Sequence, residues 1–196
     1  DIARRSLEAL KEVTIAFARA QVQAGADLIC LADHATGGMV SPVMYRELLL
    51  PIHQEITAAV GCPMVLHCCG NTSDRLRDFA ETGVACYHFE SQVPLAEAVA
   101  ATRGKITLMG NISNTGVLLP GTPAEVATAC RGAIAGGVHI LAPECAVPLT
   151  TPLRNLRTLV EVAECSRTGG FCATAQEQPG APGASEQEMR PAGGRT

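Results

Sequence analysis

Three side chains in this sequence have the types and spacing of a metal site. His67 and Cys69 follow the apolar run 63–66, and Cys145 lies shortly after a second apolar run at 138–141. If both runs are parallel strands of one sheet, the three side chains emerge at the same edge. One imidazole and two thiolates with an open fourth position are typical of a catalytic zinc. The alternative is an ordinary histidine beside two buried thiols, but soft ligands at two strand ends favour a metal.

The donor set also predicts the chemistry. Two thiolates and a neutral imidazole cancel the charge of zinc, so the centre is a weak Lewis acid but a good holder of a third thiolate. A substrate thiol at the open position would lose its proton and become a nucleophile at neutral pH. We therefore expect alkyl transfer to sulfur. Cys68 is expected to point away from the site, and Gly70 to let the chain turn tightly beneath the metal.

Short apolar segments alternate with helical patterns along the chain. The predicted strands are 27–32, 64–67, 84–89, 106–109 and 138–141. The predicted helices are about 2–24, 41–60, 73–82, and three that begin near 94, 122 and 151. Ser41-Pro42 and Thr122-Pro123 are helix start signals, the second with a capping-box Glu125, and Pro51 should kink its helix.

This alternation predicts an α/β fold of parallel βα units, either an open doubly wound sheet or part of a barrel. Every predicted strand ends in a polar or reactive group, which favours the barrel because barrel enzymes draw their sites from several strand ends. No glycine-rich nucleotide-binding motif follows a strand. We predict about five βα units of a (β/α)8 TIM barrel at residues 1–166 and a disordered Gly/Pro/Ala-rich tail at 167–196.

Composition excludes several classes of partner. The net charge is −4 and there is no basic run, which argues against binding to nucleic acid. The sequence also lacks a stretch of 18 apolar residues, so we predict no membrane span. Nine cysteines without a signal peptide predict a reducing compartment, the cytoplasm. Five of them are interpreted as small core residues: Cys30, Cys62, Cys86, Cys130 and Cys165. The chain starts at Asp1 without Met, as a piece of something longer would.

The segment 66–72 (Leu-His-Cys-Cys-Gly-Asn-Thr) resembles the His-x-Cys-Gly-Asn-Thr motif of the methylcobalamin:coenzyme M methyltransferases. That family belongs to the uroporphyrinogen decarboxylase-like barrels. The resemblance covers residues 1–165 and continues in the segments 37–42, 45–47, 108–113, 118–123 and 140–145.

The resemblance implies a zinc ion held by His67, Cys69 and Cys145. It also implies that a small thiol such as coenzyme M receives a methyl group from methylcobalamin carried by a corrinoid protein. The family barrel is longer, so the chain corresponds to its C-terminal five-eighths, and the missing N-terminal barrel segment is a candidate partner. Glu144 stands where a small residue is expected, which makes the acceptor less certain.

Further candidates lie at the other strand ends. Glu90 is the catalytic candidate, as a displaceable fourth zinc ligand or a partner that orients His67, with a solvated carboxylate as the alternative. Asp33, Asn111 and Glu144 are the substrate-binding candidates, with Asp33 contacting substrate or cobalamin.

Two pairs of polar residues receive no catalytic role. His53 and His139 lie inside a predicted helix and strand. Arg46 and Arg75 are expected at the surface, with contact to an anionic acceptor as the alternative.

Three other interpretations remain open. A methionine-synthase-like enzyme would use a similar zinc site with a folate donor. A uroporphyrinogen decarboxylase-like enzyme would use no metal, which the two cysteines do not favour. A five-unit segment with open sheet edges could also be inactive until a partner completes it.

Overall fold

The computed structural model describes residues 2–168. The predicted tail at 167–196 therefore lies outside the described residues, except for positions 167 and 168, which belong to the last helix. Five parallel strands form one sheet in the order β1-β2-β3-β4-β5. They are β1 (Ile29–Asp33), β2 (Met64–Cys68), β3 (Cys86–Phe89), β4 (Thr107–Ile112) and β5 (Ile140–Pro143). A sheet in sequence order is that of a barrel, because an open doubly wound sheet reverses its order at a switch point. The predicted partial TIM barrel is confirmed.

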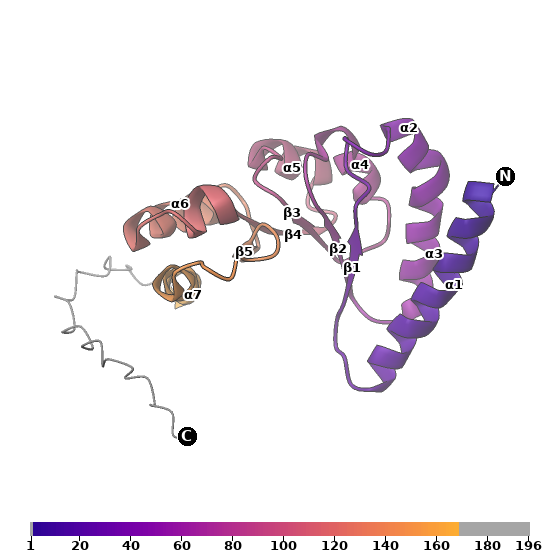
Figure 1. Ribbon diagram of the computed structural model, residues 1–196, viewed down its shortest axis with the longest axis horizontal. Helices are drawn as coiled ribbons and strands as arrows, with labels where there is room; N and C mark the ends of the chain where they lie inside the picture. The colour runs from indigo at the N-terminus through magenta and orange to yellow at the C-terminus, as the bar shows by residue number, and fades with distance from the viewer. Residues whose placement is uncertain (1, 169–196) are drawn as a thin grey trace, which may run out of the picture.

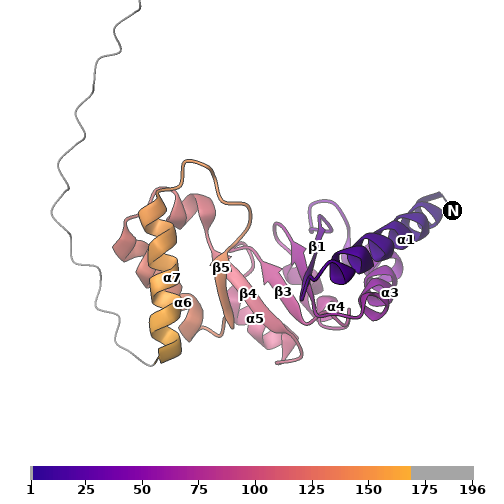
Figure 2. The same cartoon turned by 90° about the horizontal axis from the view of Figure 1, so that it is seen from below.

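Helices connect successive strands. They are α1 (Ile2–Gln23), α2 (Pro42–Met44), α3 (Leu50–Val60), α4 (Leu76–Phe79), α5 (Leu95–Thr102), α6 (Pro123–Ala135) and α7 (Leu153–Thr168). Two π-helical turns, η1 (Tyr45–Leu49) and η3 (Asn114–Leu118), and one 3-10 turn, η2 (Ser73–Arg75), complete the described elements. The strands fan out between α1 and α3 at one end of the molecule and α6 and α7 at the other (Figures 1 and 2).

The two faces of the sheet differ in burial. On the face that the helices cover, Leu66, Tyr87 and Leu108 pair in register and are fully buried. The opposite face is buried at its centre, at Val65 and Cys86, but at its edges Cys30 is exposed and Ile140 keeps 44% of its surface accessible. The prediction that Cys30 is a core residue is therefore wrong. It lies on edge strand β1, which pairs with β2 on one side only in the described sheet.

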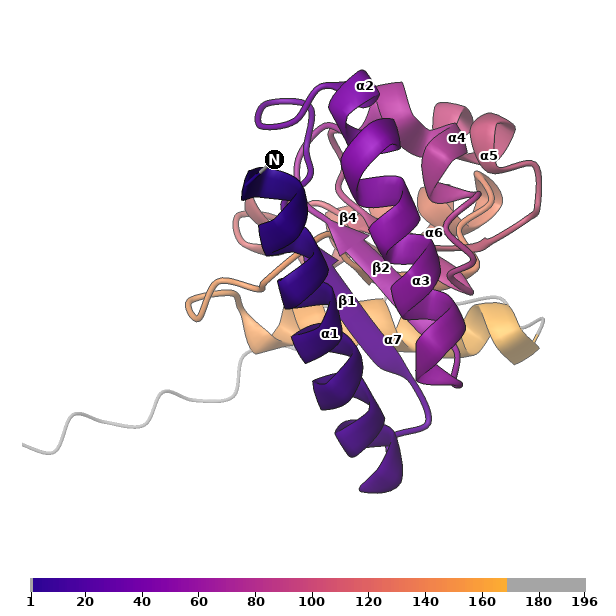
Figure 3. The same ribbon diagram turned by 90° about the vertical axis from the view of Figure 1, so that its right-hand side faces the viewer.

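Local signals explain where several helices begin. The Ser41 hydroxyl accepts a hydrogen bond from the Met44 amide, and Thr122 and Glu125 form the predicted capping box of α6. The predicted distortion near Pro51 takes the form of the π-helical turn η1, which joins α2 to α3. α1 and α3 then lie side by side, and α1 also contacts β1 (Figure 3).

The predicted helix over 73–82 is much shorter in the structure. Only α4 is α-helical there, after the 3-10 turn η2, and Arg75 at the end of that turn is directed inward and buried. Its guanidinium donates hydrogen bonds to the carbonyl oxygens of Ala35 (2.7 Å) and Val40 (2.6 Å). The prediction of a surface arginine is wrong at this position, because Arg75 fastens the loop after β1 to the loop after β2. Within residues 2–168, no helix is long and apolar enough to cross a membrane.

Candidate metal centre

The three predicted metal ligands meet at one end of the sheet. His67 Nε2 lies 3.1 Å from Cys69 Sγ and 3.6 Å from Cys145 Sγ, and the two sulfur atoms are 3.5 Å apart. Ordinary zinc bond lengths and tetrahedral angles would place such atoms about 3.5–3.8 Å apart. Among the described residues, this is the group of histidine, cysteine and acidic side chains whose ligand atoms could hold an ion. Two of the three separations match this range and the third is shorter, so the residues fit zinc after a small movement of the His67 or Cys69 side chain.

The strand register explains why the ligands converge. His67 pairs with Ala32 of β1 and His88 of β3, so its side chain lies on the open face of the sheet. Cys68 points to the helix side and is fully buried, as predicted. Alternation then returns Cys69 to the side of His67.

The loop after β2 packs against the loop after β1 and is hydrogen-bonded to it. Gly70 has φ +73°, and a Cβ at this position would lie 2.8 Å from Thr36 Oγ1. The Gly37 amide and the Thr36 hydroxyl both donate to the carbonyl oxygen of Asn71, over 3.0 and 3.3 Å. This close approach confirms the tight turn predicted at Gly70, and it limits how far Cys69 can move.

The electrostatics of the cluster suit a cation. Burial, together with the neighbouring Cys145 and the carboxylate of Glu90, raises the pKa of the Cys69 thiol to about 12. Without a cation the thiol therefore keeps its proton, whereas a divalent cation would supply the positive charge that stabilises the thiolate, because a coordinating thiol loses its proton. The donor set therefore matches zinc in charge as well as in geometry.

Glu90 lies close to the ligands but outside their cluster. The Glu90 carboxylate is near enough to the Cys69 thiol to help raise its pKa. The same carboxylate accepts a hydrogen bond from Gln92 Nε2 (3.2 Å). His67 Nδ1 is buried with no hydrogen-bond partner in the described part of the chain, so Glu90 does not orient that ring through Nδ1. That Glu90 is the displaceable fourth zinc ligand remains a prediction.

His88 is a site residue that the sequence analysis missed. Its ring packs on His67 with centroids 4.5 Å apart, and its Nε2 donates to the carbonyl oxygen of Pro143 over 2.8 Å. Burial lowers the pKa of His88, and the hydrogen bond to Pro143 only partly offsets this effect. A neutral His88 therefore links the strand that carries His67 to the end of β5. The alternation within Cys86-Tyr87-His88-Phe89 could have placed it on the open face.

The structure gives Asp33 two protein partners. Its carboxylate accepts a hydrogen bond from the Ala35 amide (2.9 Å) and contacts His53 Nε2 (2.7 Å), while His53 Nδ1 lies 2.9 Å from the Tyr45 hydroxyl. Burial would raise the pKa of Asp33, but the hydrogen bonds from His53 and the main chain outweigh it and lower the pKa. Asp33 pairs with Cys68, on the face opposite His67, which does not favour the predicted substrate contact.

Asn111 lies in β4, and Glu144 directly follows β5. Asn111 pairs with Ala142 and is half-buried, on the same face as Met109 and next to the open site. Glu144 is buried, and burial would raise its pKa, but hydrogen bonds from Ser91 and from the chain after β4 lower it. Both oxygens of Glu144 thus already have protein donors, whereas Asn111 remains a candidate for substrate contact.

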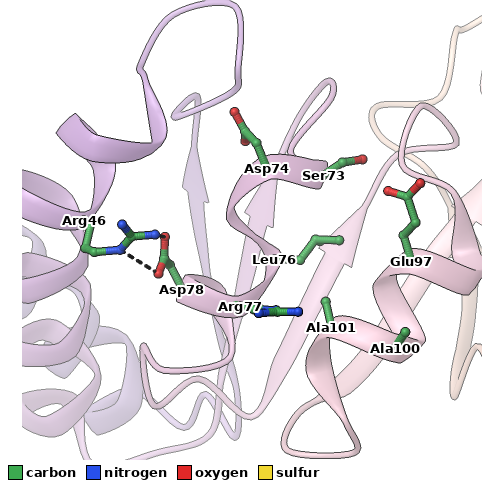
Figure 4. Close-up of a pocket in the computed structure, with 9 residues that line it drawn as sticks. All are labelled: Arg46, Ser73, Asp74, Leu76, Arg77, Asp78, Glu97, Ala100 and Ala101. Atoms are coloured by element: carbon green, nitrogen blue, oxygen red, sulfur yellow. Dashed lines mark hydrogen bonds and ion pairs between the residues drawn. The ribbon is translucent and has the colours of Figure 1, made fainter.

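A cavity of about 460 Å³ lies on the helix side of the sheet and contains none of the three ligands. It is lined by charged residues of both signs, and a two-pronged ion pair between Arg46 and Asp78 occupies one end (Figure 4). Arg77 and Glu97 face it from α4 and α5. Its mixed charge and the absence of the three ligands from its lining distinguish it from the metal centre.

Five consecutive βα units of a TIM barrel, with zinc-type ligands at the strand ends, define the class of the chain. The model of the uroporphyrinogen decarboxylase (URO-D) family matches residues 1–165. The chain therefore belongs to this family.

Individual proteins and solved structures also match the chain. A methylcobamide:CoM methyltransferase of Methanosarcina barkeri is 35% identical over 162 residues, which is 82% of this chain and 48% of that protein. The solved structure of a methyltransferase from Methanosarcina mazei matches with a TM-score of 0.81 and 31% identity, over 84% of this chain and 49% of that one. A B12-independent methionine synthase from Shewanella, at 19% identity and a TM-score of 0.63, covers 82% of this chain and 54% of its own and shows the shared fold. The chain spans about half the length of the curated relatives it matches.

Proposed function

We propose that this chain is the zinc-holding part of a methyltransferase that moves a methyl group from a methylated corrinoid protein to a small thiol such as coenzyme M. The carrying observation is the set of three ligand atoms, drawn from two strand ends and 3.1–3.6 Å apart. Relatives named methylcobamide:CoM methyltransferases support this donor and acceptor.

Each site residue has a separate role in the proposed reaction. When bound to His67, Cys69 and Cys145, zinc would lower the pKa of the acceptor thiol so that it is a nucleophile at neutral pH. Glu90, beside Cys69, would fill the remaining coordination position until the acceptor enters. Asn111 would contact the acceptor from the open face. The methylcobalamin donor would approach the same face, because helices cover the other one.

A metal assay tests the site itself. The purified chain should bind about one zinc ion. If about 10–16 kcal/mol of zinc binding is shared by four ligands, each contributes about 3 kcal/mol, so Cys69→Ser or Cys145→Ser should weaken binding at least ~100-fold. Cys62→Ser is the matched control, because Cys62 is half-buried at the opposite end of β2. Equal zinc affinity in all four proteins would contradict the proposal.

A second assay separates the donors. Methylcobalamin mixed with the zinc-loaded chain and coenzyme M should lose its methyl-cobalt absorbance, whereas a folate-dependent enzyme of the methionine synthase type would leave it unchanged. A decarboxylase would act without zinc. Unchanged absorbance with every thiol tested, in a chain completed as described next, would overturn the corrinoid assignment.

We also propose that the sheet edges are completed by the remaining βα units of the barrel, supplied by the same polypeptide or by a partner. The exposed Leu28 and Cys30 at β1 and the exposed Ile140 at β5 support this, because a closed barrel pairs both edges. Adding the N-terminal half of a relative's barrel should bury these residues and raise methyl transfer. No change in cysteine accessibility at position 30 would contradict this completion.

A further inference from the structure

The carboxylate of Glu144, directly before Cys145, accepts four hydrogen bonds. One oxygen accepts from the Asn114 amide (2.7 Å) and the Ser113 hydroxyl (3.0 Å). The other accepts from the Ser91 amide (2.9 Å) and the Ser91 hydroxyl. Ser91 follows β3, and Ser113 and Asn114 follow β4. A single buried carboxylate therefore joins the ends of three neighbouring strands.

This carboxylate has no capacity left for a substrate. Each oxygen already accepts two hydrogen bonds, and only 8% of the residue is exposed. Its donors are neutral, so no salt bridge is involved, and the directions of the hydrogen bonds fix the position of the carboxylate. The predicted substrate contact is the weaker interpretation of Glu144.

The main chain on both sides of Cys145 is also fastened. The Glu144 amide donates to the carbonyl oxygen of Ile112 (2.9 Å), and Asn114 Nδ2 donates to the carbonyl oxygen of Ala146 (2.9 Å). The Cys145 sulfur atom itself lies 3.5 Å from Cys69 Sγ and 3.6 Å from His67 Nε2. The position of its sulfur atom is therefore set by its neighbours in sequence.

We propose that Glu144 is a positioning residue, which holds the Cys145 sulfur atom at bonding distance from a metal shared with His67 and Cys69. This inference rests on the proposed zinc site and adds to it the element that orders its distant ligand. Loss of an outer partner of this kind lowers metal affinity about 10–100-fold. We expect a loss in this range, together with a weaker bond from the second sulfur.

The test combines metal affinity with a spectroscopic count of sulfur ligands. Zinc affinity is measured by competition with a chelator, and the cobalt(II)-loaded protein reports thiolate bonds through its near-ultraviolet charge-transfer band. Glu144→Ala should bind zinc about 10–100-fold more weakly and shift the cobalt band towards that of Cys145→Ser. Glu144→Gln should lose less zinc affinity than Glu144→Ala. The carbonyl oxygen of the glutamine can accept from one pair of donors, but its NH2 group would face the Ser91 amide, which is also a donor.

Two further variants separate positioning from stability. Asp78→Asn removes a second buried carboxylate, which pairs with Arg46 away from the metal centre, and should leave the cobalt spectrum unchanged. Ser91→Ala combined with Ser113→Ala leaves Glu144 only its two main-chain donors. It should lower zinc affinity less than Glu144→Ala does, and it replaces that variant if the latter does not fold.

Each outcome decides the proposal. A wild-type cobalt spectrum in Glu144→Ala, or in the double serine variant if the first does not fold, overturns the positioning role and leaves the zinc site intact. An equal loss in Asp78→Asn also overturns it, because the effect is then general destabilisation. If the wild-type chain binds neither zinc nor cobalt, the proposed function fails, and the positioning role fails with it.

Discussion

The close approach between Gly70 and Thr36 gives the sharpest test of how the metal centre is built. Gly70→Ala would force a Cβ to within 2.8 Å of Thr36 Oγ1 at a φ of +73°. Gly61→Ala is a matched control, because Gly61 has φ +80° and nothing within 4 Å of the added atom. The two variants share the backbone strain and differ in the collision.

The expected magnitudes follow from these two terms. An alanine in the left-handed region costs about 1–2 kcal/mol, which is the full expected effect of Gly61→Ala on the free energy of unfolding. Overpacking adds about 1–3 kcal/mol, so Gly70→Ala should cost about 2–5 kcal/mol. Because Cys69 precedes Gly70, zinc affinity should fall in Gly70→Ala and stay unchanged in Gly61→Ala.

A second substitution tests whether the collision is the cause. Thr36→Ala removes the hydroxyl and the methyl group that the new Cβ would meet, and leaves a Cβ at 3.4 Å. In the Gly70→Ala background it should restore most of the zinc affinity, measured by chelator competition, and part of the urea midpoint. The reasoning is refuted if Gly70→Ala is no less stable than Gly61→Ala, or if Thr36→Ala fails to rescue zinc binding.

Two predictions concern the scaffold behind the site. Asp33→Asn should destabilise the fold by about 1.5–3 kcal/mol at pH 7, because it replaces a charged acceptor of the His53 contact. The folded-state pKa of Asp33 is lowered, so the wild-type advantage is complete above the unfolded value of about 4 and shrinks as the pH falls below it. Urea denaturation at several pH values measures this, and a difference that grows on acidification would contradict it. Thr122→Ala should cost about 1 kcal/mol through loss of the α6 capping box, and an unchanged urea midpoint would show that the cap contributes nothing.

The sequence predicted those features that depend on neighbouring residues. The strand predicted at 64–67 is observed as Met64–Cys68, and the capping box of α6 is present. The strand predicted at 138–141 is observed as Ile140–Pro143, two residues later, because pairing with Met109 sets its start. Strand ends follow hydrogen-bond partners, which lie far away in the sequence.

The features that the sequence missed depend on long-range packing. Arg75 was expected at the surface because its carbonyl partners belong to a loop 35–40 positions away. His88 acquires a role only through its register with His67. Glu144 is predicted to bind substrate, but its carboxylate accepts from four donors in two segments whose meeting no local pattern reveals.

The separation of the two cysteines along the chain has a consequence for folding. Cys69 and Cys145 lie 76 positions apart, with β3 and β4 between the strands that carry them. An ion bound by both would act as a reversible cross-link, and closing a loop of that length by a covalent bridge restricts the unfolded chain by about 4–5 kcal/mol. Folding and loading would then be one equilibrium, in which the supply of free zinc sets the fraction of chains that survive as folded protein. Scarcity of the metal would thus reduce the abundance of the protein as well as its turnover.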